Sequence, residues 1–185
     1  MKVEKPTTEQ IEAGLSDVLA SPEDQGKLEA IVIRPKADQR ELLEAVFLSP
    51  EGGVEGDRWA ATSFLRLPDG QPDPRVQVSL MNARILRLIA RDDQRIGLAG
   101  DNLVVDMDLS EANMSVGQKL AVGEALLEIT DIPHTGCGAF AERFGPDAVR
   151  FINAAERKSL HLRGIYAQVL QAGTVRTGDI VRKAE

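Results

Sequence analysis

The residues with the clearest chemical potential lie in one short segment of the chain. Cys137 is the only cysteine among 185 residues, and it stands between Gly136 and Gly138, three residues after His134. A thiolate is both a nucleophile and a soft metal ligand, but a thiol ionises near neutral pH only with help from a base, a cation or backbone dipoles. Because the flanking glycines carry no side chains, a large partner could approach the sulfur closely.

A structural role for this cysteine is an equal alternative, since free cysteine is often buried as a small hydrophobe. The segment Pro-His-Thr-Gly-Cys-Gly nevertheless has the composition of a loop. A Cys–His hydrolase would take His134 or His161 as its base, but the sequence identifies no third residue to orient it. One cysteine and two histidines do not show the spacing of a zinc site, and no phosphate-binding glycine motif is present.

The composition restricts the class of protein. A net charge of −7 does not fit a basic surface for nucleic acid, and 4% aromatic residues are too few for a base-stacking platform. A single cysteine excludes an internal disulfide and fits a reducing compartment. The N-terminal segment lacks a signal-peptide core, and no apolar run is long enough to span a membrane. We therefore expect a cytoplasmic protein that binds neither nucleic acid nor membrane.

The elements that must hold the cysteine segment are predicted from hydrophobic periodicity. Residues 7–20 read as an amphipathic helix, with Thr7 and Gln10 at capping-box spacing and Ile11, Leu15, Val18 and Leu19 on its apolar face. A second helix is predicted over residues 81–93, with Asn82 as its N-cap. A third is predicted over residues 145–158, and its inward face consists of Ala148, Phe151, Ile152 and Ala155. Alternating residues predict strands over 27–35, 41–49, 75–80, 101–107, 118–132 (a hairpin turning at Gly123-Glu124) and 164–183.

These elements define a fold class. Strands outnumber helices and do not alternate strictly with them, which disfavours a doubly wound parallel sheet. Many short strands with glycine-rich turns predict a β-rich α+β fold, a barrel-like bent sheet, mixed or antiparallel, with two to three peripheral helices. Residues 1–26 are predicted to form an N-terminal helical appendage, and residues 27–185 the β-barrel domain.

The order and spacing of four segments resemble the MOSC domain family, named for the C-terminal domain of molybdenum cofactor sulfurase. The third segment is the most specific: a Gly-Asp-Asn turn enters a strand, the hairpin follows, and then comes the cysteine. The segments are GGVEGDRW (52–59), RVQVSLMNARIL (75–86), residues 98–131, and GIYAQVLQAGTVRTGDIVRK (164–183). Together they cover most of residues 27–183, so the whole β-rich part of the chain carries the resemblance.

The resemblance implies a domain that handles sulfur or the molybdenum cofactor (molybdopterin). Members carry sulfur as a cysteine persulfide, or hold the cofactor and reduce N-hydroxylated compounds with the loop cysteine ligating the metal. Carried over, Cys137 is the catalytic residue and the molybdenum ligand. The cofactor-binding residues implied by the match and by their place in the cysteine loop are Arg58, Asn102, Ser79, Asn82, His134 and Thr135.

The implied partners are a small-molecule cofactor or substrate and, for sulfur transfer, a cysteine desulfurase. That desulfurase would hold pyridoxal phosphate (PLP), which we do not expect this chain to bind covalently. From the residues alone, Asp101 and Asn102 fit an Asx turn, and Arg58 fits a solvated charge. Two alternatives therefore stand beside the leading hypothesis: a non-catalytic module that binds a ligand or protein, and a redox-sensing thiol. The sequence does not decide whether the protein is an enzyme.

Overall fold

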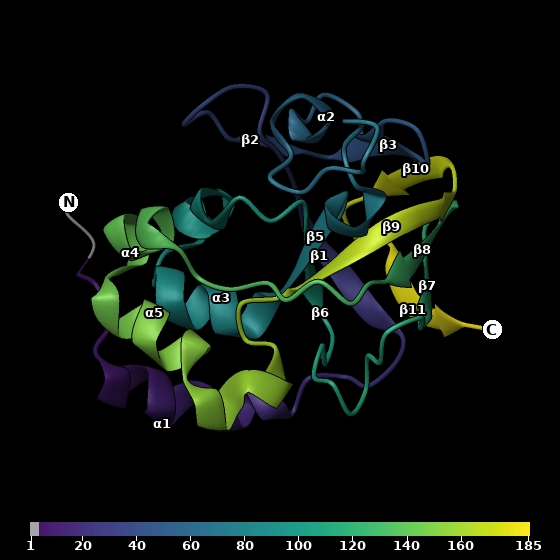
Figure 1. Cartoon of the computed structure of the whole chain (residues 1–185). Helices are drawn as coiled ribbons and strands as arrows, with labels where there is room; N and C mark the ends of the chain where they lie inside the picture. The colour runs from purple at the N-terminus through teal and green to yellow at the C-terminus, as the bar shows by residue number, and fades with distance from the viewer. Residues whose placement is uncertain (1–3) are drawn as a thin grey trace.

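The computed structural model describes residues 4–185, with the strands on one side and most helices on the other (Figure 1). Within these residues, seven strands close into a barrel in the order β1, β6, β5, β9, β8, β7, β11, and β11 pairs back onto β1. Their bounds are β1 (Gly26–Ile33), β5 (Val78–Asn82), β6 (Leu103–Asp106), β7 (Lys119–Val122), β8 (Ala125–Ile129), β9 (Ile165–Gln171) and β11 (Ile180–Ala184). The barrel-like, β-rich α+β class predicted from the sequence is confirmed.

The barrel is mixed, because β5 and β6 run parallel and the other neighbours run antiparallel. The single strand predicted over 41–49 is wrong, because the chain divides at Glu44. The first piece, β2 (Glu41–Leu43), pairs with β1. The second piece belongs to a separate sheet, whose order is β10 (Gly173–Arg176), β3 (Ala45–Ser49), β4 (Gly53–Val54).

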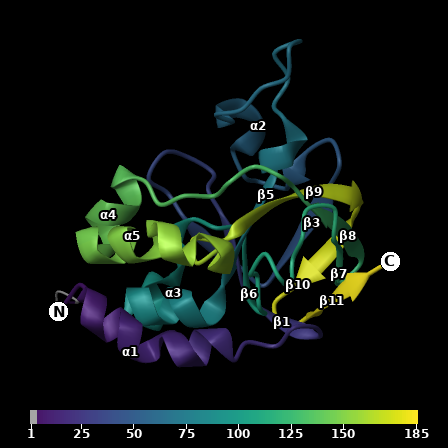
Figure 2. The ribbon, with the colours of Figure 1, turned by 60° about the horizontal axis from the view of Figure 1, so that its bottom comes forward.

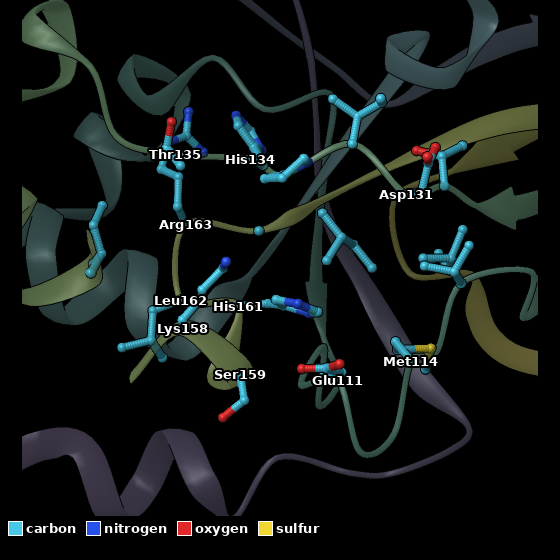
Figure 3. Close-up of a pocket in the computed structure, with 18 of the residues that line it drawn as sticks. Glu111, Met114, Asp131, His134, Thr135, Lys158, Ser159, His161, Leu162 and Arg163 are labelled. Carbon is cyan, nitrogen blue, oxygen red and sulfur yellow. The ribbon is translucent and has the colours of Figure 1, made fainter. Parts of the chain in front are cut away.

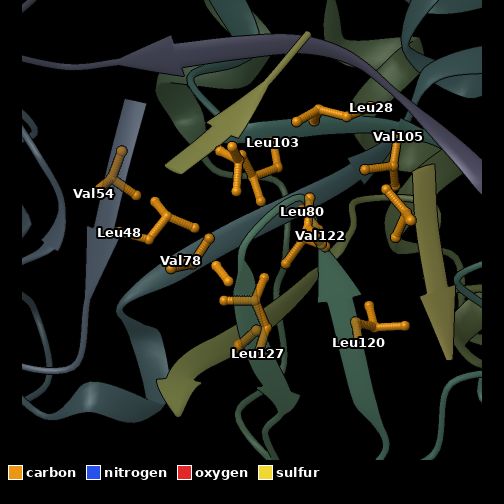
Figure 4. Close-up of a cluster of buried hydrophobic side chains, with 14 of the residues drawn as sticks. Leu28, Leu48, Val54, Val78, Leu80, Leu103, Val105, Leu120, Val122 and Leu127 are labelled. Atoms are coloured by element: carbon orange, nitrogen blue, oxygen red, sulfur yellow. The ribbon is translucent and has the colours of Figure 1, made fainter. Parts of the chain in front are cut away.

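The barrel interior is filled with aliphatic side chains, as Figure 4 shows. Leu28, Leu80, Leu103 and Leu127 come from four different strands and have no exposed surface. Each such side chain contributes about 1.5–3 kcal/mol of burial free energy. The predicted hairpin is present: β7 and β8 turn at Gly123, whose φ of +53° suits the glycine position of a type II′ turn. The packed barrel is the rigid frame from which the cysteine loop extends.

The helices form a second apolar cluster beside the barrel (Figure 2). Its helices are α1 (Thr8–Leu19), α3 (Ala83–Ala90), α4 (Gly138–Phe144) and α5 (Pro146–Asn153). The capping box of Thr7 and Gln10 is present, and Ile11 of α1 is fully buried. Leu19, which was expected on the apolar face of this helix, is 58% exposed. None of the helices within residues 4–185 has the length and apolar character needed to cross a bilayer.

Several predicted boundaries are corrected by local chemistry. The strand predicted from residue 75 begins at residue 78, since Pro74–Val76 form a 3-10 turn (η1) that the side chain of Asp73 caps. Helix α3 begins after Asn82, which is its N-cap as expected. The helix predicted over 145–158 ends at Asn153, a 3-10 segment η3 (Ala155–Leu160) follows, and Ala155 is exposed. The short elements α2 (Trp59–Thr62), α4 and η2 (Asp93–Ala99) were not expected.

Candidate functional site

The cysteine loop leaves the end of β8 and returns to the helices at α4. Cys137 is exposed and is the N-cap of α4, so its sulfur is reachable from solvent. The backbone just before it is held from α5: Gly136 N donates to Asn153 Oδ1 at 2.9 Å, and Asn153 Nδ2 donates to Gly136 O at 3.0 Å. One side chain therefore fixes both polar backbone groups of the residue that precedes the cysteine.

The two glycines beside the cysteine have different surroundings. A Cβ on Gly136 would lie 3.1 Å from Ile152 Cδ1, so this glycine allows the loop to pack against α5. A Cβ on Gly138 would meet nothing within 4 Å. The space beside Gly138 is open, which agrees with the expectation that a bulky partner can approach the sulfur.

His134 lies behind the loop in a nearly closed environment. Its ring stacks on Tyr166 with 4.3 Å between ring centroids, and its Nδ1 lies 3.6 Å from Asp101 Oδ1, too far for a hydrogen bond. Burial, followed by the charges of Arg163 and Arg34, holds the pKa of His134 well below 6.5. His134 is therefore neutral at neutral pH, and it does not supply a cation to stabilise the Cys137 thiolate.

A buried ion pair lies beside this histidine. Arg163 Nη1 donates to Asp101 Oδ1 at 2.8 Å and to Oδ2 at 2.7 Å, and the guanidinium lies over the ring of Phe140. Burial raises the pKa of Asp101 although Arg163 opposes the shift. Burial and the charge of Asp101 raise the pKa of Tyr166 to about 12, and Cys137 acts in the same direction. Tyr166 is therefore neutral at neutral pH.

A second polar network joins three strands around Asn102. Asn102 Oδ1 accepts from the backbone N of Ser79 at 3.1 Å and from its Oγ at 3.2 Å, while Nδ2 donates to Val32 O and Asp57 Oδ2 at 3.2 Å. Asp57 also accepts a bidentate pair of hydrogen bonds from Arg34, each 2.8 Å long. Burial acts to raise the pKa of Asp57, but the hydrogen bonds and charge of Arg34 outweigh it and lower that pKa. Asn102 and Ser79 therefore support Arg34, and their polar atoms are already hydrogen-bonded within the fold.

Four arginines gather near this network. The side chains of Arg34 and Arg40 both lie against Gly100. Burial, followed by repulsion from Arg143, Arg34 and Arg58, lowers the pKa of Arg40. The Nε of Arg40 is buried without a hydrogen-bond partner, and the guanidinium of Arg58 has no hydrogen bond or ion pair with any residue in 4–185. A concentration of positive charge in an acidic protein suits an anionic ligand.

Not every residue predicted for the site joins this region. Asn82 stands at the opposite end of β5 from Ser79, and its amide caps α3 and donates to Ser21 Oγ and Met107 O. Its polar groups thus stabilise the fold. Thr135 is exposed beside His134. The sequence analysis missed seven residues that the structure brings to the site: Arg34, Arg40, Asp57, Asp101, Asn153, Arg163 and Tyr166.

A cavity of about 790 Å³ lies along the inner side of the loop (Figure 3). His134 and Thr135 line it, whereas Cys137 is not among its lining residues. His161, the other candidate base, also lines this cavity. Among residues 4–185, no group of three or more His, Cys, Asp or Glu side chains is placed to hold a metal ion. A metal at Cys137 would therefore have to arrive with other ligands.

The closed mixed barrel and its cysteine loop define a class of protein that comparisons with known proteins identify. The family model described as "MOSC domain" matches residues 73–182, more than half of the 185 residues. The chain therefore belongs to the MOSC domain family.

Solved structures agree with the fold. YuaD from Bacillus subtilis is 19% identical, with a TM-score of 0.62 over 87% of this chain and 97% of that one. YiiM from Geobacillus stearothermophilus is 17% identical, with a TM-score of 0.57 over 86% of this chain and 75% of that one. YiiM from Escherichia coli is 19% identical, with a TM-score of 0.54 over 86% of this chain and 70% of that one. A search of curated proteins gives no match.

Proposed function

We propose that this MOSC protein acts through the sulfur of Cys137, which either ligates molybdenum of a bound molybdenum cofactor or carries sulfur as a persulfide. The observation that carries the proposal is the exposure of Cys137 at the end of a loop that Asn153 holds in place. His134, in the same loop as Cys137, stacks on Tyr166 and lies 3.6 Å from Asp101, so this loop also contacts the buried polar groups.

The residues present fit an anionic pterin cofactor. Arg58 has an unpaired guanidinium, and Arg40 has a buried Nε without a partner, so a phosphate could satisfy both. Arg34 is already held by Asp57 and serves to position the group. Asn102 accepts hydrogen bonds from Arg34 and from Ser79, and so helps to hold Arg34 in place. The exposed Thr135 and the buried ring of His134 would form the side of the site that belongs to the cysteine loop. When bound, the cofactor would supply the redox chemistry for reducing N-hydroxylated compounds.

The sulfur-carrying version needs only the thiolate and a donor. Cys137 Sγ attacks the outer sulfur of a donor persulfide, a new S–S bond forms at Cys137, the donor's S–S bond breaks, and the donor leaves as a thiolate. The electrons balance without an external oxidant, because one persulfide replaces another. A PLP-dependent cysteine desulfurase, with PLP on that partner, is the donor this version implies. Because Cys137 is exposed, such a partner can reach it.

The test is the cofactor content of protein purified from cells that make the molybdenum cofactor. We expect wild type to carry molybdenum and pterin, Cys137→Ala to lose molybdenum, and Arg58→Ala and Arg40→Ala to lose pterin. Arg182→Ala is the matched control, because Arg182 is an exposed arginine on β11. Wild type without either component would remove the cofactor version. Reversible oxidation of Cys137 in that cofactor-free protein, without any persulfide, would instead favour the redox-sensing thiol.

A further inference from the structure

The cavity behind the cysteine loop has the size of a small-molecule site. Its volume of about 790 Å³ falls within the roughly 300–1,000 Å³ that such sites occupy. Four segments enclose it: residues 111–116, residues 129–135, the end of α5 at Ile152 and Asn153, and the stretch from η3 into the start of β9. Figure 3 shows labelled residues of the first, second and fourth of these segments around the cavity. Cys137 does not line this cavity, although His134 and Thr135, which belong to the proposed cofactor site, do.

The inner wall of the cavity is apolar and fixed. Met114, Ile129, Leu162 and Ile165 line it, and each is at most 5% exposed, so the barrel and the helices hold them in place. Gly164 allows β9 to start close to β5, since a Cβ there would lie 2.1 Å from Leu80 O. Val116 also lines the cavity and is 65% exposed, so it offers apolar surface against which a ligand would replace water.

Two opposite charges stand at the rim without pairing. Lys158 on η3 and Glu111 on the facing loop both line the cavity, and neither forms an ion pair with any residue in 4–185. Their backbones are tied together, because Glu111 N donates to Ser159 O at 2.8 Å. The side chains of both residues appear on the same side of the cavity in Figure 3. The rim therefore offers one cation and one anion on neighbouring backbone segments that are hydrogen-bonded to each other.

His161 adds a hydrogen-bonding group with a defined tautomer. Its Nδ1 lies 2.8 Å from Leu109 O, and a carbonyl oxygen can only accept, so Nδ1 carries the proton. The neutral ring is then left with Nε2 as an acceptor. The backbone of His161 is left-handed at φ 48°, a conformation in which a non-glycine residue is uncommon. The hydrogen bond to Leu109 and the left-handed backbone both hold His161 in place.

We infer that the cavity binds a small zwitterion with an apolar body, the chemistry of an apolar amino acid or dipeptide. The ligand's carboxylate pairs with Lys158, its ammonium group with Glu111 and His161 Nε2, and its side chain packs on Val116, which is 65% exposed. A simple anion is disfavoured, because Glu111 and Asp131 both line the cavity. A simple cation is disfavoured by Lys158 and Arg163. Cys137 itself does not line this site.

The test is isothermal titration calorimetry of the full chain with four probes. L-Leucine and L-leucyl-L-leucine are zwitterions, N-acetyl-L-leucine lacks the ammonium group, and isoamylamine lacks the carboxylate. We expect at least one zwitterion to bind about tenfold more tightly than either analogue, since a charged hydrogen bond contributes that much. Lys158→Gln should abolish the advantage over isoamylamine, and Glu111→Gln the advantage over N-acetyl-L-leucine.

Matched variants show whether binding depends on the residues of this cavity. Lys27→Gln and Glu55→Gln change exposed residues of the same types elsewhere, and they should retain wild-type affinity. Ala155→Trp, at the exposed rim, should weaken all four probes by filling the entrance. Cys137→Ala should bind as wild type does, so loss of cofactor binding would leave this inference standing. Wild type that shows no saturable binding up to about 10 mM, or binds the zwitterions no better than the analogues, overturns it.

Discussion

Two buried aspartates, Asp57 and Asp101, each pair with an arginine, yet their surroundings differ. Asp57 accepts five hydrogen bonds: three from Arg34, one from Trp59 N and one from Asn102 Nδ2. Asp101 is fully buried. Among the side chains of residues 4–185, only that of Arg163 donates hydrogen bonds to its carboxylate, both from Nη1. The pKa of Asp57 is lowered, whereas burial raises that of Asp101.

The difference shows what each pair contributes. Asp57 is a structural clamp: its hydrogen bonds compensate for its burial, and it holds Arg34 beside the arginine group. Asp101 is incompletely compensated, and His134 beside it stacks on Tyr166 and belongs to the same loop as the exposed Cys137. Incompletely compensated buried charges with perturbed pKa values are typical of functional sites, whereas well-satisfied ones are typical of structural sites. We therefore expect the two aspartates to respond differently to the same substitution.

The largest effect is expected from Asp57→Asn. All five partners of this carboxylate are donors, so either orientation of the amide turns its NH₂ group toward at least two of them. The free energy of unfolding should fall by about 3–5 kcal/mol, measured by urea denaturation at pH 7. Asp38→Asn is the control, because Asp38 is exposed and its contact with Arg143 is long, at 3.5 Å. If the free energy of unfolding fell less for Asp57→Asn than for Asp101→Asn, the structural role assigned to Asp57 would be contradicted.

Asp101→Asn should destabilise less, by about 1–3 kcal/mol. The amide oxygen can keep the hydrogen bond from Arg163, while its NH₂ group turns toward His134. The raised pKa adds a pH signature: ionisation of Asp101 opposes folding, so this destabilising contribution of the wild type appears as pH rises through the folded pKa. The variant's loss of unfolding free energy relative to wild type should therefore be smaller at pH 7 than at pH 4 in the same urea assay. A pH-independent difference would show that the carboxyl is not perturbed by burial.

His134→Phe keeps the ring stacked on Tyr166 but removes its titration. The lowered pKa of His134 means that its contribution is fully present above 6.5 and is lost as pH falls below 6.5 toward the folded pKa, because only the unfolded state gains the proton. Wild type should lose up to about 1.4 kcal/mol per pH unit in that window from this group. Urea unfolding at pH 7.5 and 5.5 should show a flatter profile for the variant. Parallel profiles would mean that His134 titrates normally in the folded protein.

Tyr166→Phe is expected to have the smallest effect. The ring contacts with His134 remain, and the hydroxyl makes no hydrogen bond to any residue in 4–185. The free energy of unfolding should change by less than about 0.5 kcal/mol. Tyr166→Ala, which removes the ring, should destabilise clearly more in the same assay. Equal losses for the two variants would assign the stabilising contact to the hydroxyl.

The comparison also shows what could be predicted from the sequence. The barrel class, the β7–β8 hairpin and the caps at Thr7 and Asn82 depend on local patterns, and they are confirmed. The ion pairs join residues far apart in the chain, such as Arg34 with Asp57 and Asp101 with Arg163. No periodicity indicates such pairs.

The sequence analysis selected Arg58 and Asn102 from two Gly-Asp motifs. The buried charges belong to the aspartates just before them, Asp57 and Asp101. Helix α4 was missed for a different reason. It has only seven residues, and a glycine at each end interrupts the helical pattern.

The most direct test of the account concerns the sulfur of Cys137. Protein purified from cells that make the molybdenum cofactor is treated with iodoacetamide, and its intact mass is measured beside its molybdenum content. We expect either an unalkylated fraction that equals the molybdenum occupancy, or alkylated protein carrying about 32 Da of extra sulfur. Complete alkylation of Cys137 without added sulfur, in protein that also contains molybdenum and pterin, would contradict the claim that this sulfur is the acting atom.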